Sequence, residues 1–213
     1  MLKIYAFATP NSVKVPIALE ELGLEYELIA VNVRKGEQKL PSFIALNANA
    51  KVPVLVDLQG PAGNAMTLTE SGAILIYLAE KTGHLLPTHG EARSRVFEQL
   101  FFQGTGIGPA LGQSGFFQRQ ASEVIPLAIA RFRDEAHRTL SVLNHTLSNR
   151  SFTAGDDYSI ADIAHFGWMW RRDFAGIDLS DYPNVARWYE LVLARPAVSR
   201  ALERVTALMP PQA

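Results

Sequence analysis

Residues 51–83 read KVPVLVDLQGPAGNAMTLTESGAILIYLAEKTG, and this stretch decides the fold class. Val52 to Val56 predicts a strand that enters at a proline, where a missing N–H group is tolerated. Met66 to Thr69 predicts a second, short strand. Glu70 to Lys81 is strongly apolar and predicts a helix that ends at Gly83, a usual C-terminal capping residue. Two strands followed by a helix are typical of a small α/β domain.

The residues before this stretch extend the same domain. They predict, in chain order, a strand over Leu2–Phe7, a helix capped by Asn11 or Ser12 that runs to about Leu22, a strand over Leu24–Val33 and a short helical turn over Pro41–Leu46. The resulting βαβ-α-ββ-α order fills residues 1–83. His84 to Gly90, with a proline and a glycine, forms a linker.

Residues 91–213 contain no convincing strand pattern and predict an all-helical domain. Predicted helices cover about Glu91–Gln103 with a continuation through the glycine-rich middle, Val124–Ser148, Ile160–Phe174, Pro183–Ala194 and Pro196–Thr206. Ser159 and Asp162 have the spacing of a capping box, which marks a helix start. We expect the last four residues, 210–213, to be loosely held.

Composition and charge exclude several classes of function. Twenty Lys and Arg residues face twenty-one Asp and Glu residues, so a net charge of −1 argues against nucleic acid as a partner. The chain has no cysteine, which excludes disulfides, zinc sites built on cysteine and a protein thiol nucleophile. The longest apolar run, Ala73–Ala79, is far shorter than the ~20 residues of a membrane span. Without a secretory signal pattern, the expected location is the cytoplasm.

Charged residues make up 19% of the chain, below the usual ~25%, which hints at an apolar subunit interface.

Two sequence patterns that could indicate a nucleotide site or a metal site are not supported. The glycines of Gly104–Gly108 resemble a dinucleotide loop, but a helix precedes them and Pro109 replaces the third glycine, so helix packing or a bend explains them better. No histidine pair has metal-ligand spacing, so we expect no metal site.

Three turns in the first domain carry candidate chemistry. Thr9-Pro10-Asn11-Ser12 places polar side chains at a helix start, where backbone N–H groups favour an anion, although the same residues also suit an ordinary cap. Lys51-Val52-Pro53 is a candidate cis peptide that leaves the Val52 backbone open to a peptide ligand, or a plain strand-edge proline. Glu70-Ser71-Gly72 suits the ammonium and carboxylate of an amino acid, or again a cap.

Together these features resemble the glutathione transferase superfamily over essentially the whole chain. The matching motifs are Val-Pro before the third strand, ESGAILIYLAEKTG at 70–83 and SIAD at 159–162. The motifs at 9–11, 20–24, 35–38 and 108–113 resemble the nu-class bacterial glutathione-dependent disulfide-bond oxidoreductases. The chain departs from that group at Ser12, where glycine is usual, and at Ser114-Gly115. The resemblance implies an α/β thioredoxin-like N-terminal domain plus an all-α C-terminal domain.

The resemblance also implies a function and a site. It implies glutathione-dependent reduction of small disulfides by a homodimer, with glutathione or its disulfide as the bound species. Conjugation of glutathione to electrophiles, reduction of peroxides and a non-catalytic binding or regulatory module remain alternatives. The implied glutathione-binding residues are Gln38, Lys51, Val52, Pro53, Glu70, Ser71, Arg131 and Asn11, with Thr9 and Asn11 facing the sulfur. Tyr5 lies too early in the first strand to act as the tyrosine of the mammalian-type classes.

Thiolate activation is feasible without a protein tyrosine or cysteine. A free thiol has a pKa of ~8.5, so only about 3% is thiolate at pH 7. Lowering that pKa by two units requires ~2.7 kcal/mol of preferential anion stabilisation. One hydrogen bond to a charged group supplies ~1.5–3 kcal/mol, and a helix N-terminus adds ~0.3–1 kcal/mol. Thr9 or Asn11 together with a helix end is therefore sufficient.

Overall fold

The computed structural model describes residues 1–209, so the expectation for residues 210–213 lies outside it. Contacts divide the chain into two compact units. The first unit contains residues 1–84 and the described residues from Arg195 onward, and the second contains Leu85 to Ala194. Within residues 1–209, no helix combines the length and the apolar character that crossing a membrane requires.

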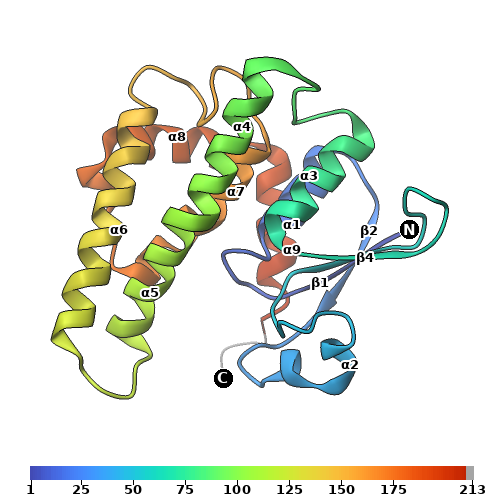
Figure 1. The fold of residues 1–213 in the computed structure, drawn as a ribbon, viewed down its shortest axis with the longest axis horizontal. Helices are drawn as coiled ribbons and strands as arrows, with labels where there is room; N and C mark the ends of the chain where they lie inside the picture. Colours follow the sequence, from blue (N-terminus) through green and yellow to red (C-terminus); the bar gives the residue numbers. More distant parts are fainter. Residues whose placement is uncertain (210–213) are drawn as a thin grey trace. The chain divides into compact units, whose positions relative to one another are not determined.

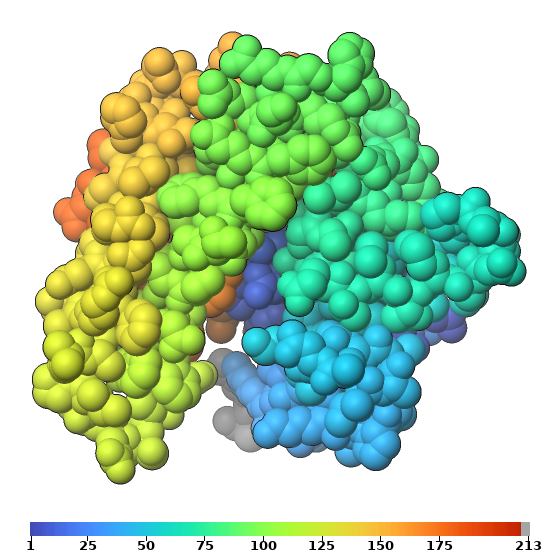
Figure 2. All heavy atoms as spheres, viewed as in Figure 1, coloured from blue at the N-terminus to red at the C-terminus, as the bar shows by residue number. Residues whose placement is uncertain are grey.

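The first unit is built on a four-stranded mixed sheet in the order β2-β1-β3-β4 (Figure 1). Strand β1 is parallel to β2 and antiparallel to β3, and β3 is antiparallel to β4. The elements of this unit are β1 (Leu2–Ala6), α1 (Lys14–Glu21), β2 (Tyr26–Ala30), η1 (Glu37–Lys39), α2 (Pro41–Ile44), β3 (Val54–Asp57), β4 (Met66–Thr69), α3 (Ser71–Thr82) and α9 (Pro196–Thr206). The loop that joins β3 to β4 projects at the surface (Figure 2). This is the thioredoxin-like arrangement that the sequence predicted.

Side chains on the two faces of the sheet have different surroundings. Ile4 and Leu55 are paired across β1 and β3 and are fully buried. The next pair, Tyr5 and Val54, faces the opposite way because side chains alternate along a strand. Val54 lies in a cluster with Phe43 of α2, and the Tyr5 ring packs edge-on against Phe43 with centroids 6.4 Å apart. Tyr5 is therefore a packing residue of the sheet.

Helix α9 is joined to α1 by ion pairs, although the sequence pattern grouped it with the C-terminal helices. Arg195 donates two hydrogen bonds to the Glu21 carboxylate, at 2.6 and 2.9 Å. Arg200 and Arg204 donate to the Glu20 carboxylate at 2.8 and 3.0 Å. Burial by itself would raise the pKa of Glu20, but the hydrogen bonds from Arg200, Arg204 and Tyr26 lower it overall.

The second unit is helical, as predicted. Its elements are α4 (Gly90–Phe102), a π-helical turn η2 (Gln103–Ile107), α5 (Gly108–Arg119), α6 (Pro126–Thr146), α7 (Ile160–Trp170), two 3₁₀ turns (Arg172–Ala175 and Leu179–Asp181) and α8 (Pro183–Leu193). The glycine-rich middle lies within helix and allows close packing. A Cβ atom on Gly115 would lie 2.1 Å from the Phe174 ring, and one on Gly112 would lie 3.2 Å from Trp168. The glycines at 104–108 themselves lie in η2 and at the start of α5, in continuous helical structure and not in a strand-to-helix loop, which removes the dinucleotide-loop interpretation.

The capping box predicted at Ser159 and Asp162 is present at the start of α7. The buried Asp162 carboxylate accepts hydrogen bonds from the backbone N–H groups of Thr153 and Ser159 at 2.8 and 3.0 Å. It also accepts one from Trp188 Nε1 at 2.9 Å. These bonds join α7, the preceding loop and α8 around one carboxylate.

Candidate glutathione site

A small pocket in the first unit brings together residues from separate parts of the chain. It is lined by Asn11, Asn47, Lys51, Val52, Pro53, Glu70 and Ser71. Six of these seven residues were predicted site residues, and they come from all three turns that the sequence singled out. The pocket offers a carboxylate, an ammonium group, a hydroxyl and amides. This mixture suits a small zwitterionic peptide.

The Val52–Pro53 peptide bond is cis, the first of the two alternatives that the sequence left open. Strand β3 starts only at Val54, two residues later than the predicted strand. The pairing of β3 with β1 and β4 also starts at Val54, so Val52 lies outside both hydrogen-bond ladders. Its backbone is therefore available to pair with the backbone of a bound peptide, as in strand-addition recognition.

Asn47 is a site residue that the sequence reasoning missed. It is 8% exposed, and its Nδ2 donates a hydrogen bond of 2.7 Å to the carbonyl oxygen of Lys51. Its Oδ1 accepts from the backbone N–H of Asn49 at 3.0 Å. Asn47 thus holds the turn that leads into the cis peptide. The signal in the sequence was weak, because an asparagine after a short helical turn is common in loops.

Glu70 and Ser71 form the junction of β4 with α3. Glu70 has φ +66°, which a non-glycine residue adopts at a cost of order 1–3 kcal/mol. Glu70 is the N-cap residue of α3, and its side chain makes no capping hydrogen bond to the helix. The simple cap interpretation is therefore wrong here, and the exposed carboxylate is left at the pocket.

The β1–α1 turn differs from its prediction. Helix α1 begins at Lys14, after an N-cap, Val13, that makes no side-chain cap bond. The predicted capping by Asn11 or Ser12 is wrong, because a turn over residues 10–13 delays the helix. Thr9 Oγ1 accepts a hydrogen bond from the Ser12 backbone N–H at 3.2 Å. The Asn11 side chain reaches the pocket instead of the helix backbone.

Lys14 is the second residue that the sequence reasoning missed. It is 1% exposed, and its Nζ donates to Asn11 Oδ1 at 2.8 Å and to Ser71 Oγ at 3.4 Å. Burial lowers the pKa of Lys14 from 10.5 to about 7, against the attraction of Glu70. A signal was present, because this lysine stands among the apolar residues of Val13–Leu19, all of which are buried.

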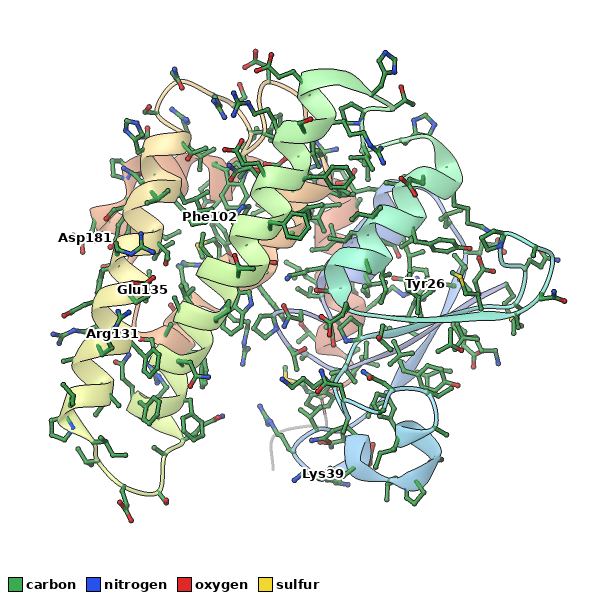
Figure 3. The ribbon with its side chains drawn as sticks, in the orientation of Figure 1. Tyr26, Lys39, Phe102, Arg131, Glu135 and Asp181 are labelled. Atoms are coloured by element: carbon green, nitrogen blue, oxygen red, sulfur yellow. The ribbon has the colours of Figure 1, made fainter. Side chains whose placement is uncertain are left out.

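Three predicted site residues, Thr9, Gln38 and Arg131, are not among those that line the pocket. Gln38 lies on η1, and its Oε1 is buried without a hydrogen-bond partner. Arg131 lies on α6 of the second unit, where its side chain is 65% exposed and donates to Glu135 at 3.3 Å (Figure 3). The roles of Thr9, Gln38 and Arg131 stay predictions. Among the described residues, no group of three or more histidine, aspartate or glutamate side chains could hold a metal ion.

Comparison with known proteins defines the class. Residues 1–80 match the model of the glutathione S-transferase N-terminal domain, and residues 129–196 match that of the C-terminal domain. The chain is 44% identical to disulfide-bond oxidoreductase YfcG of Escherichia coli, over 95% of this chain and 94% of that protein. The chain therefore belongs to the glutathione S-transferase family, and the predicted fold class is confirmed.

Solved structures agree with this assignment. A glutathione transferase family member from Pseudomonas fluorescens, crystallised with two glutathione molecules bound, superposes with a TM-score of 0.90 at 40% identity. The match covers 95% of this chain and 92% of that one. A glutathione transferase from Pseudomonas putida, with one glutathione disulfide bound per subunit, gives 0.88 at 41% identity and covers 95% and 90%.

Proposed function

We propose that this chain binds glutathione in the pocket of its first unit and uses it to reduce small disulfides. The observation that carries the proposal is the convergence of the cis Val52–Pro53 turn with Glu70 and Ser71 in one pocket. An open peptide backbone beside a carboxylate and a hydroxyl matches a γ-glutamyl peptide, which has its own backbone, ammonium and carboxylate groups. The relative YfcG, named a disulfide-bond oxidoreductase, supports the choice of reaction.

The reaction balances without a protein thiol. The thiolate of one glutathione attacks a sulfur of the disulfide, forms a mixed disulfide and releases the first thiolate, which takes up a proton. A second glutathione thiolate attacks the glutathione sulfur of the mixed disulfide and releases the second thiol. Two glutathione thiols are oxidised to glutathione disulfide while one disulfide is reduced to two thiols. Because the chain has no cysteine, both attacking thiols come from glutathione.

The proposed roles follow the chemistry of each side chain. The Val52 backbone pairs with the cysteinyl unit, and Glu70 and Ser71 hold the γ-glutamyl end through its ammonium and carboxylate. Lys51 and Gln38 hold the glycyl carboxylate, and Arg131 adds a charge from the second unit. Thr9 and Asn11 face the sulfur, where a donor stabilises the thiolate over the thiol.

We also infer that the working form is a cytoplasmic homodimer. The cytoplasm holds the reduced glutathione that the reaction consumes. Exposed apolar side chains, among them Phe101 of α4 at 69% exposure, supply surface for self-association. Light scattering at micromolar concentration should give twice the 23.4 kDa of one chain, and a value near one chain mass would contradict the dimer.

Substrate profiling of the pure protein tests the function. Glutathione-dependent reduction of 2-hydroxyethyl disulfide is expected to be clearly faster than conjugation of glutathione to chloro-dinitrobenzene or reduction of cumene hydroperoxide. Fast conjugation without disulfide reduction would assign the chain to the conjugating alternative. Glutathione binding with no turnover in all three assays would identify a binding or regulatory module.

A further inference from the structure

Lys14 lies behind the pocket and connects two of its walls. The residue is buried at the first position of α1, and its Nζ reaches Asn11 on the β1–α1 turn and Ser71 at the start of α3. These two residues are 60 positions apart in the sequence and belong to different pocket-forming turns. One buried amine therefore contacts both the turn assigned to the sulfur and the turn assigned to the γ-glutamyl end.

The contact with Lys14 determines which end of the Asn11 amide faces the pocket. An ammonium group donates hydrogen bonds and accepts none, so the atom of Asn11 at 2.8 Å from it is the oxygen. The amide nitrogen, with its two N–H donors, is then the end left for a ligand. Asn11 is exposed and lines the pocket, so these donors are accessible there.

The same argument applies to Ser71. Its Oγ accepts from Lys14 at 3.4 Å, a long hydrogen bond. A hydroxyl that accepts on its oxygen still has its own O–H to donate. Because Lys14 occupies the acceptor oxygens, the N–H groups of Asn11 and the O–H group of Ser71 remain to donate to a ligand. Hydrogen-bond donors suit anionic groups such as a thiolate and a carboxylate.

Burial makes the ammonium form of a lysine energetically unfavourable at this position. Its pKa falls to about 7 because of desolvation, which the nearby Glu70 opposes by attraction. An apolar side chain would avoid that cost, since the surrounding residues of α1 are apolar and buried. A strongly perturbed group behind a pocket is a candidate for a functional role.

We propose that Lys14 is a positioning residue of the glutathione site, which orients Asn11 and Ser71 so that both present hydrogen-bond donors to glutathione. This inference rests on the proposed use of the pocket for glutathione. The amine itself stays behind the pocket wall and acts through its two neighbours. A bound anion favours the ammonium form of Lys14, so glutathione and the proton on Lys14 strengthen each other's binding.

The test compares Lys14→Met, Asn11→Ala and the double variant with the unmodified protein. Methionine keeps the length of the apolar stem and removes the amine. Lys3→Met is the matched control, because Lys3 lies on β1 and pairs with Glu27 away from the pocket. Glutathione affinity is measured by calorimetry, and the pKa of the bound glutathione thiol is followed by the ultraviolet absorbance of the thiolate.

We expect Lys14→Met to raise the pKa of the bound thiol by about one unit, which lowers the thiolate fraction about threefold at pH 7 if the bound thiol starts about two units below the free value of ~8.5. Asn11→Ala should raise it by a similar amount. In the double variant the increase should equal that of Asn11→Ala alone, because Lys14 influences the sulfur through Asn11. Additive increases would show that Lys14 acts independently of Asn11 and would overturn the proposal, as would an unchanged thiol pKa in Lys14→Met.

A second variant keeps the proposal testable if Lys14→Met does not fold. Asn11→Asp retains an acceptor for Lys14 but replaces the N–H donors with a carboxylate oxygen. The thiol pKa should then rise at least as far as in Asn11→Ala, and a wild-type value would refute the donor orientation. Failure of the unmodified protein to bind glutathione would refute the proposed function itself, which separates that result from an error about Lys14.

Discussion

Asn47 Nδ2 donates a hydrogen bond of 2.7 Å to the carbonyl oxygen of Lys51, and this bond holds the turn that presents Val52 to the pocket. Asn47→Ala removes it. A net loss of ~0.5–1.5 kcal/mol predicts glutathione binding weaker by about 2- to 10-fold. Calorimetric titration checks this. Asn49→Ala is the matched control, because Asn49 contacts Asn47 through its backbone N–H, which alanine retains. Equal effects of both variants would contradict the role of Asn47.

Glu70 and Ser71 are expected to set the affinity for the γ-glutamyl end. Loss of one charge-assisted hydrogen bond costs ~1.5–3 kcal/mol, so Glu70→Gln and Ser71→Ala should each weaken glutathione binding about 10- to 150-fold. Arg131→Ala should have a comparable effect if that side chain reaches the ligand. Calorimetry on the three variants decides each role separately. Wild-type affinity in Arg131→Ala would remove that residue from the site.

Thr9 and Asn11 are expected to orient the attacking sulfur together. Each single alanine variant should lose about 10- to 100-fold in kcat/KM for 2-hydroxyethyl disulfide, equivalent to ~1.4–2.7 kcal/mol. The double variant should lose more than either single variant and still bind glutathione, because the γ-glutamyl contacts remain. An unchanged rate in the double variant would show that neither side chain contributes to the reaction.

Lys14 should make the stability of the ligand-free protein depend on pH. Its pKa is about 7 in the folded protein and 10.5 ordinarily. Between these values the unfolded chain holds the proton and the folded chain does not, so the contribution of Lys14 to the free energy of unfolding increases with pH. The increase is at most about 1.4 kcal/mol per pH unit, and below pH 7 it vanishes because both states are protonated.

Urea unfolding of the unmodified protein and Lys14→Met at pH 7 and pH 9 measures this dependence. The stability advantage of Lys14→Met should be largest at pH 7 and should shrink toward pH 9. Parallel changes in the two proteins would mean that Lys14 titrates normally in the folded state.

Arg195, which precedes α9, should hold this helix to α1 through its pair with Glu21. A double-mutant cycle on Glu21→Gln and Arg195→Gln should give a coupling energy of about 1–2 kcal/mol, since the bond is bidentate and Glu21 is largely buried. The Arg95–Glu98 pair on α4 is more exposed and should give a smaller coupling. Equal coupling in the two cycles would contradict a special role for the Arg195 pair.

Much of the fold could be predicted because local patterns and tertiary packing agree. Met66–Thr69 and Pro196–Thr206 have the predicted bounds, and the capping box at Ser159 forms as expected. Predictions failed where a side chain had two possible partners. Asn11 could cap a helix or accept from the amine of Lys14 three residues later, and only the folded chain shows that the helix begins too late for that cap and that Lys14 Nζ is the partner.

The sequence by itself determined the family, the combination of a thioredoxin-like and a helical domain, and the absence of a protein thiol, while the structure decided that the Val52–Pro53 bond is cis. These properties depend on periodicity, on motifs of adjacent residues and on composition, none of which requires knowing which residues the fold brings together. Only the tertiary structure decided that Asn47 holds the Lys51 turn and that Lys14 lies behind Asn11 and Ser71. The contact of Lys14 with Ser71 spans 57 positions of the chain, and the two shorter contacts depend on the folded shape of their turns, so no sequence pattern predicts them. The buried amine takes its low pKa from the desolvation that packing imposes.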